Sequence, residues 1–446
     1  MAHFFIGFLL LVCCYVCSAS TTDLESCEVR FHVAFFALHS NLGSFVMRGF
    51  MMSSTLNNNP HLCVDARVFT STHSNLTTFL GNTAAVPVCI FVKDTVADMI
   101  VECQKQKALI FLDALDDIAT ARRLVRYGTQ TGPLPKFIYS YLVQSTFLTN
   151  ELIKRNVSAY YYPHQHGNSI PYKTLRDVTH SSPLVVGFMA GTIKNVPDMQ
   201  SVILKGLCSL QDVEFHVVNQ NIHSVVCSNT TTASSVSSSV TVYTCAKDVN
   251  GNYMNSTLTT YTHTNRPNDF CHQDAFYLDK ALSAADVGLV WTDHIITPSN
   301  VWDLSMLRPP TRMLHWMSRG VPVVYFPTHS YVDVARLNGY ETGLDFLLEA
   351  HDSDTLALAI KRLRDEKLRR LLSDRALKIA AKHTIERTAG LLTDIFVQHA
   401  AGCVCSHRKV SFAPCGNRQI DDVLCSKLEL LTLQLRQRNS SKVDRI

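Results

Sequence analysis

The chain has 446 residues, enough for two domains of ordinary size, and 46% of them are hydrophobic, which indicates a globular protein with a substantial core. Only 17% are charged, which is low for a cytosolic protein. The formal net charge of +4 is too small to argue for nucleic acid as a partner, and we expect none.

The N-terminus predicts a signal peptide over residues 1–19. The apolar run from Phe4 to Cys17 is shorter than the roughly twenty residues that span a bilayer, and the small residues Cys17 and Ala19 precede the expected cleavage. An uncleaved signal anchor is the alternative, because no Lys or Arg precedes the run. In both cases we expect the chain to enter the ER or Golgi lumen or be secreted, with no later membrane span.

Residues 27–175 predict a first Rossmann-like domain, because strands and helices alternate through them. The expected strands are 29–38, 61–69, 87–92, 108–112, 136–143 and 159–163, and the expected helices are 45–56, 97–107, 117–127 and 146–155. Gly43 lies in the loop after the first strand, a position at which α/β domains bind ligands.

His164 and His166 follow the last of these strands, at the junction with the second half of the chain. An imidazole there can act as a catalytic acid or base or bind sugar hydroxyls. Histidines with a purely structural role are the alternative interpretation. A zinc site would need a third and a fourth ligand, which the sequence does not offer nearby, so we expect no metal.

Residues 183–400 predict a second Rossmann-like domain. Strand 183–189 leads into a turn with Gly191 and Lys194, and helix 196–207 and strand 213–218 follow. Residues 224–269 are rich in Ser, Thr and Asn, and Asn250-Gly251 predicts a β-hairpin that protrudes from the domain as a surface insertion. The remaining expected elements are helix 277–284, strand 287–291, two helices within 352–379 and a helix over 385–399.

Residues 308–327 are the most informative segment of the chain. Pro309 and Pro310 suit a helix start, Gly320 suits a helix C-cap with positive φ, and the apolar run 321–326 suits a buried parallel strand. Thr311, flanked by Arg308 and Arg312, lies at the expected helix N-terminus, where a diphosphate would be bound favourably.

This segment reads Pro-x-x-Arg-x-Leu-x-x-Met-x-x-Gly-Val-Pro-Val-Val and resembles the nucleotide-sugar-binding segment of glycosyltransferases with the two-Rossmann GT-B architecture. The resemblance implies two parallel-sheet domains that face each other across a cleft, with a final helix that crosses back to the first. It also implies a set of donor-binding residues: Gly43, Gly191, Lys194, Arg308, Thr311, Arg312 and His315.

Two residues depart from the pattern of that family. His315 stands where the family has an acidic residue that binds the donor ribose, and no Arg follows Gly187. A neutral imidazole can still accept one hydrogen bond. Donor affinity should therefore fall as the pH drops through the pKa of His315, which we expect near the usual 6.5.

The resemblance implies transfer of a sugar from a nucleotide-sugar to a lumenal glycan, lipid or protein, without a metal or another cofactor. A non-catalytic glycan- or protein-binding module on the same scaffold is the alternative, favoured by the two departures. A structural disulfide-rich secreted protein would explain the cysteines but not the alternation of strands and helices.

The cysteines and sequons agree with a lumenal protein. Of 15 cysteines, three precede residue 19, which leaves an even twelve. Cys403, Cys405, Cys415 and Cys425, in a tail over 401–446, predict two disulfides rather than a zinc site. At least one further bridge is expected among Cys227, Cys245 and Cys271.

N-glycans are expected at Asn75, Asn156, Asn229, Asn255 and Asn439.

Overall fold

The computed structural model describes the chain in segments. They are residues 27, 29–36, 46–69, 75–82, 84–93, 97–114, 140–154, 156–166, 183–190, 199–210, 212–223, 234–247, 253–265, 285–291, 309–340, 348–405 and 427–434. The expected signal peptide (1–19) and the expected helices 117–127 and 277–284 lie outside the described residues.

The first domain is built on a six-stranded parallel sheet with the strand order β2-β1-β3-β4-β5-β6. The expected strands are confirmed, each with slightly different ends. They are β1 (Phe31–Phe36), β2 (Val64–Phe69), β3 (Val86–Val92), β4 (Leu109–Asp113), β5 (Ser140–Val143) and β6 (Ala159–Tyr161).

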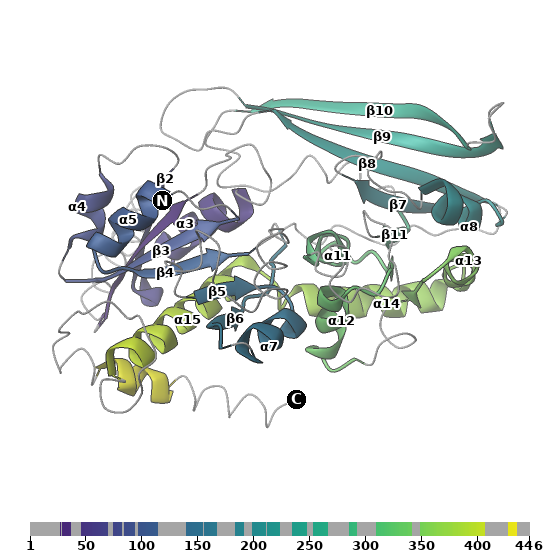
Figure 1. Ribbon diagram of the computed structural model, residues 1–446. Helices are drawn as coiled ribbons and strands as arrows, with labels where there is room; N and C mark the ends of the chain where they lie inside the picture. The colour runs from purple at the N-terminus through teal and green to yellow at the C-terminus, as the bar shows by residue number, and fades with distance from the viewer. Residues whose placement is uncertain are drawn as a thin grey trace, which may run out of the picture.

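Helices cover both faces of this sheet (Figure 1). Because successive side chains of a strand point to opposite faces, Val33 and Phe35 pack with α3 (Met52–Asn57) and α15 (Ile385–Cys405). Ala34 and Phe36 pack with side chains of α4 (Leu76–Leu80), α5 (Ala97–Lys105) and α7 (Thr146–Lys154) on the other face. A turn of π-helix, η2 (Val46–Met51), leads directly into α3.

The last long helix belongs to the first domain although it follows the second in sequence. The ring of Phe396, on α15, lies 5.7 Å from the ring of Phe31 and 5.8 Å from that of Phe111. This confirms the expected helix that crosses back to the first domain. The helix extends to Cys405, so the expected boundary between residues 400 and 401 falls inside it.

The second domain is built on a seven-stranded sheet with the order β10-β9-β8-β7-β11-β12-β13. Five neighbouring strands of this sheet are parallel to one another. In spatial order they are β8 (Val213–His223), β7 (Leu184–Ala190), β11 (Val287–Val290), β12 (Val323–Tyr325) and β13 (Leu348–Glu349). One face carries η5 (Met199–Leu204), α8 (Lys205–Leu207) and α13 (Ser353–Arg362). The other carries α11 (Thr311–Met317), α12 (His329–Arg336) and α14 (Glu366–Ala380).

The expected β-hairpin is present, but it does not protrude as a separate insertion. β9 (Ser234–Lys247) pairs antiparallel with β10 (Tyr253–Asn265) and also with β8, so the hairpin extends the central sheet (Figure 1). Such an extension is possible because β8 continues to His223, five residues beyond the expected end of this strand, and offers β9 a long edge.

Both sheets reverse their strand order beside the first strand of the domain. β2 and β3 flank β1, and β8 and β11 flank β7. Open parallel sheets bind ligands in the crevice that such a reversal creates beyond the carboxyl ends of the strands. The loops that carry Gly43, and Gly191 with Lys194, follow β1 and β7, but these three residues lie outside the described part of the chain.

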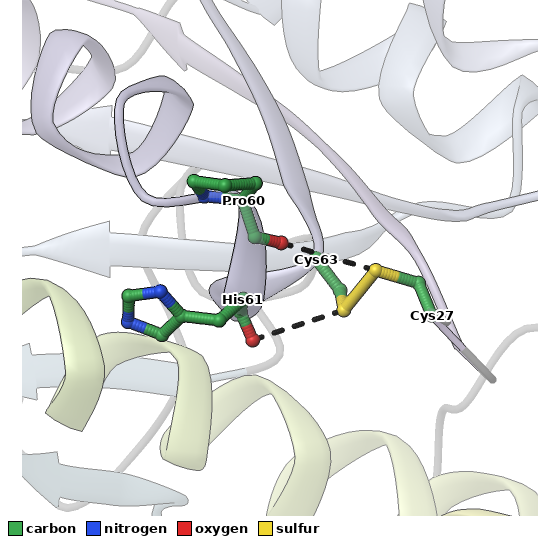
Figure 2. Close-up of a disulfide and its surroundings, with 4 residues drawn as sticks. All are labelled: Cys27, Pro60, His61 and Cys63. Atoms are coloured by element: carbon green, nitrogen blue, oxygen red, sulfur yellow. Dashed lines mark hydrogen bonds between the residues drawn. A yellow bond between two sulfur atoms is a disulfide. The ribbon is translucent and has the colours of Figure 1, made fainter. Parts of the chain in front are cut away.

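Two disulfides hold the first domain together, and neither pairing was predicted. Cys89 of β3 is bonded to Cys103 of α5, and Cys27 is bonded to Cys63 (Figure 2). Cys208 of the second domain is disulfide-bonded as well. In Figure 2 the sulfur atoms of Cys27 and Cys63 face the carbonyl oxygens of Pro60 and His61, and these are contacts only, because a bonded sulfur has no proton to donate.

Candidate functional site

The candidate site begins with α11, the helix of the segment that carries the resemblance. It starts at Thr311 directly after Pro310, and Gly320 beyond its end has a φ of 68°. The predicted start and C-cap are therefore confirmed. Thr311 and Arg312 are half-buried at this helix start, and Arg308 lies outside the described residues.

Trp316 fixes α11 against the sheet at the strand reversal. Its indole is fully buried over Gly187 of β7 and Gly288 of β11, which are paired with each other. A methyl group added to Gly187 would lie 2.6 Å from the indole, so only glycine leaves room for it. Gly187 therefore lies within a strand, as expected for residues 183–189, and leaves room for Trp316. The sequence carried a signal for this close approach of an indole, namely a glycine inside each of two buried strands.

His315 is buried one residue before Trp316, with 4% of its surface exposed. Its Nδ1 donates a hydrogen bond of 3.1 Å to the Thr311 carbonyl, one turn earlier in α11. The pKa of His315 is lowered to about 4, mainly by burial and also by the nearby His166, while the hydrogen bond to the Thr311 carbonyl opposes the shift. The expectation of an ordinary pKa near 6.5 is therefore wrong, because the ring is removed from water.

The residues Pro163–His166, which we call the histidine strap, connect β6 to the second domain. The main-chain N–H of His166 donates to the His383 carbonyl at 3.1 Å, and His166 Nε2 donates to the Ala380 carbonyl at 3.0 Å. In return, His383 Nδ1 donates to the His164 carbonyl at 3.2 Å. The strap is thereby bound to the end of α14, although the two segments are more than 200 residues apart in sequence.

The carbonyl partners fix which ring nitrogen carries the proton. His164 Nδ1 donates to the Gln165 carbonyl at 2.7 Å. Burial lowers the pKa of His164, and the charges of Arg48 and His315 act in the same direction. Burial also lowers the pKa of His166, and that of His383 to about 4. All these imidazoles are consequently neutral near pH 7, and His166 Nδ1 is buried with no hydrogen-bond partner.

A buried ion pair supports the strap from within the first domain. Arg48 Nε donates to Asp113 Oδ2 at 2.8 Å, and both residues are 1% exposed. The guanidinium also donates to the Pro163 carbonyl and to Gln165 Oε1, and it lies 3.7 Å from the centre of the Tyr162 ring. Burial raises the pKa of Asp113, and Arg48 opposes that shift.

Sequence reasoning missed both members of this pair. The signal for Asp113 was a carboxylate that ends an otherwise apolar strand, at the carboxyl edge of the sheet where sites form. Arg48 gave no comparable signal, because an arginine in an expected helix is usually exposed.

The structure thus brings the two predicted histidines of the first domain and one predicted donor residue of the second into a single cluster. His164 and His166 lie near enough to His315 for a positive charge on one ring to disfavour protonation of another. Their catalytic and donor-binding functions stay predictions. Among the described residues, no group of three or more His, Cys, Asp or Glu side chains could hold a metal ion.

The glycosylation and tail predictions can be placed only in part. Asn75 and Asn156 are exposed, and Asn255 lies in β10, whereas Asn229 and Asn439 lie outside the described residues. Cys403 and Cys405 are in the last turn of α15, and Cys415 and Cys425 lie outside the described residues, so the two tail disulfides stay predictions. Within the described part of the chain, no helix is long and apolar enough to cross a membrane.

No protein-family model matches the sequence, and no curated protein matches it. Several solved structures are similar, among them glycosyltransferases. The lipopolysaccharide outer core galactosyltransferase WaaB in its apo form is 11% identical, with a TM-score of 0.44, over 82% of this chain and 99% of that one. A glycosyltransferase from Rickettsia africae ESF-5 is 8% identical, with a TM-score of 0.45, over 83% and 99% of the two chains.

A third similar structure is the pneumococcal O-GlcNAc transferase GtfA in complex with UDP and GlcNAc. It is 10% identical, with a TM-score of 0.38, over 74% of this chain and 60% of that one. At these scores the matches assign no activity and no residue function to this chain. The function proposed next rests on the geometry of its own two domains.

Proposed function

We propose that this chain is a glycosyltransferase that transfers a sugar from a nucleotide-sugar donor to an acceptor in the secretory pathway. The observation that carries the proposal is the histidine cluster, in which residues singled out in the two halves of the sequence meet between the two parallel sheets. Its second support is the position of α11, which Trp316 holds at the reversal of strand order where open parallel sheets bind nucleotides.

The chemistry of the reaction gives the basic residues around α11 a task. Negative charge builds up on the diphosphate as the bond to the sugar breaks, and fixed positive charges and N–H donors lower the energy of that state. We assign this task to Lys194, Arg308 and Arg312, with Thr311 as a hydrogen-bond donor. We propose no metal, because these groups can supply the charge.

The disulfides of the described chain support the lumenal assignment. Cys27–Cys63 and Cys89–Cys103 are bonds typical of proteins in an oxidising compartment, since cytosolic proteins rarely keep them. The acceptor is accordingly proposed to be a lumenal glycan, lipid or protein.

Donor binding is tested by titrating the purified chain with a panel of nucleoside diphosphates and nucleotide-sugars. A charge-assisted hydrogen bond to phosphate contributes about 1.5–3 kcal/mol, so Arg312→Ala should weaken diphosphate binding by about ten- to a hundredfold. The matched control is Arg336→Ala, which removes an exposed arginine from the neighbouring helix α12. Equal affinity for a folded Arg312→Ala variant and the wild type would place the donor elsewhere.

A non-catalytic binding module is the second candidate, and one observation favours it. His164 and His166 are buried, and each gives its ring N–H to a main-chain carbonyl, so neither presents a proton to a substrate. This candidate predicts binding of the nucleotide or of a glycan without release of nucleoside diphosphate. Release that depends on both donor and acceptor would exclude it.

A further inference from the structure

A second connection between the domains joins α7 to α12. Both helices begin just beyond the carboxyl edges of their sheets, α7 after β5 and α12 after β12. Asp333 of α12 reaches the first residue of α7: the Thr146 main-chain N–H donates to Asp333 Oδ2 and the Thr146 hydroxyl donates to Oδ1, both at 2.6 Å. The ring of Phe147 stacks on that of His329, with 3.9 Å between the centres.

Asp333 thus completes the N-terminus of a helix that belongs to the other domain. Within α7, the Ser145 hydroxyl already accepts a hydrogen bond from the Leu148 N–H, as an N-cap residue does. The Thr146 N–H is one of the first-turn donors without a partner inside a helix, and Asp333 satisfies it. The negative carboxylate is also favoured there by the positive end of the helix dipole.

Burying Asp333 in this contact carries a desolvation cost that opposes its formation. Asp333 is 6% exposed, and both of its carboxylate oxygens are bound to neutral donors of a single residue. Taking a carboxylate out of water is expensive, and neutral donors offset this only in part. When the two domains separate, the carboxylate and the first turn of α7 both regain water, which offsets part of the loss of this contact.

We propose that Asp333, Thr146 and the Phe147–His329 stack form an interdomain latch that holds the two domains closed at the carboxyl edges of their sheets. The histidine strap lies at the connection between the domains and is the fixed side of this movement. The latch is the side that opens. This inference does not depend on sugar transfer, since it concerns only the relative position of the two domains.

The test compares Asp333→Ala with Asp352→Ala by small-angle scattering and amide exchange. Asp352 is a matched control, because its carboxylate caps α13 within a single domain by accepting from the Asp354 and Thr355 N–H groups. Asp333→Ala should raise the radius of gyration above the wild-type value, for which a compact chain of this length gives roughly 22 Å. Asp352→Ala should leave it unchanged.

Amide exchange separates opening of the latch from general loosening. In Asp333→Ala, exchange should accelerate in the first turn of α7 and in α12, and stay slow in the histidine strap. Thr146→Ser, which keeps both donors, should behave as the wild type, so the comparison remains possible if an alanine variant fails to fold. An unchanged radius of gyration in folded Asp333→Ala, or an equal increase in Asp352→Ala, would overturn the proposal.

Discussion

At the scale of single residues, Arg48 and Asp113 form an ion pair in the first domain in which each residue is 1% exposed. Arg48→Met should reduce the free energy of unfolding by about 3–5 kcal/mol, because Asp113 would stay buried without its cation. The carbonyl of Pro163 in the strap and that of the preceding Tyr162 would also lose their donor. Denaturant titration of the purified chain measures the loss.

The exposed pair Arg67–Asp65 is the control for this prediction. Its atoms are 3.6 Å apart and its side chains are 57% and 45% exposed. Arg67→Ala should therefore cost less than about 1 kcal/mol. Similar losses for the two arginine variants would show that burial of the Arg48 pair has no effect on stability.

His383 gives a prediction about pH. Its pKa is about 4 in the folded chain and 6.5 as the ordinary value, so the unfolded chain binds the proton more tightly. The stability that this residue contributes is complete above pH 6.5 and falls as the pH drops toward 4. Between pH 7 and pH 5.5 the wild type should lose about 1 kcal/mol more than His383→Asn, whose amide can still donate to the His164 carbonyl.

Unfolding curves at the two pH values, recorded for both proteins, measure this difference. Titrating groups that do not interact with His383 contribute equally to both proteins, so their effects cancel in the comparison. If the wild type and His383→Asn respond identically to pH, the imidazole is not the titrating group and its burial does not lower its pKa.

At the scale of elements, the position of α11 depends on the two glycines beneath Trp316. Gly288→Ala places a methyl group into the fully buried indole, and overpacking of this kind costs about 1–3 kcal/mol. Gly390→Ala in α15 is the matched control, since no atom lies within 4 Å of the added carbon and alanine favours a helix by about 1 kcal/mol. Thermal unfolding should shift down for the first variant and up for the second.

A nucleotide titration of the same two variants tests whether α11 positions the donor site. Gly288→Ala should weaken binding if the donor contacts the start of α11, while Gly390→Ala should not. A destabilised Gly288→Ala variant with unchanged nucleotide affinity would separate the packing of Trp316 from donor binding.

The sequence predicted those elements whose signals are local. Pro309, Pro310 and Gly320 marked both ends of α11, and alternation marked the strands. Helix α12 was missed, although Tyr331, Val334 and Ala335 have helical spacing. The helix has only eight residues, and it follows closely on the apolar run 321–326 that predicted a strand. The burial of His164 and His166 could not be predicted, because the groups that bind the strap at these residues, the Ala380 carbonyl and the carbonyl and ring of His383, are more than 200 residues away in sequence.

At the scale of the whole molecule, the chain closes on itself through α15. Ile385, Leu392, Phe396 and Ala400 of this helix belong to the same buried core as Phe31 and Phe111 of the first sheet. The first domain therefore includes residues that are synthesised after the entire second domain. Removing them would expose the apolar side of β1, β3 and β4 to water.

A fragment that ends at residue 182 should consequently fail to fold, although it contains all six strands of the first sheet. Replacing a buried Phe by Ala alone costs about 3–5 kcal/mol, and the fragment loses a whole helix of such contacts, against a typical stability of about 5–15 kcal/mol. The expected result is a circular dichroism melt without a cooperative transition. Addition of a peptide with residues 384–405 should restore one, whereas the same peptide with Phe396→Asp should not. A cooperative melt of the fragment by itself would mean that the first domain folds without α15, and that the long helix only joins two independent units.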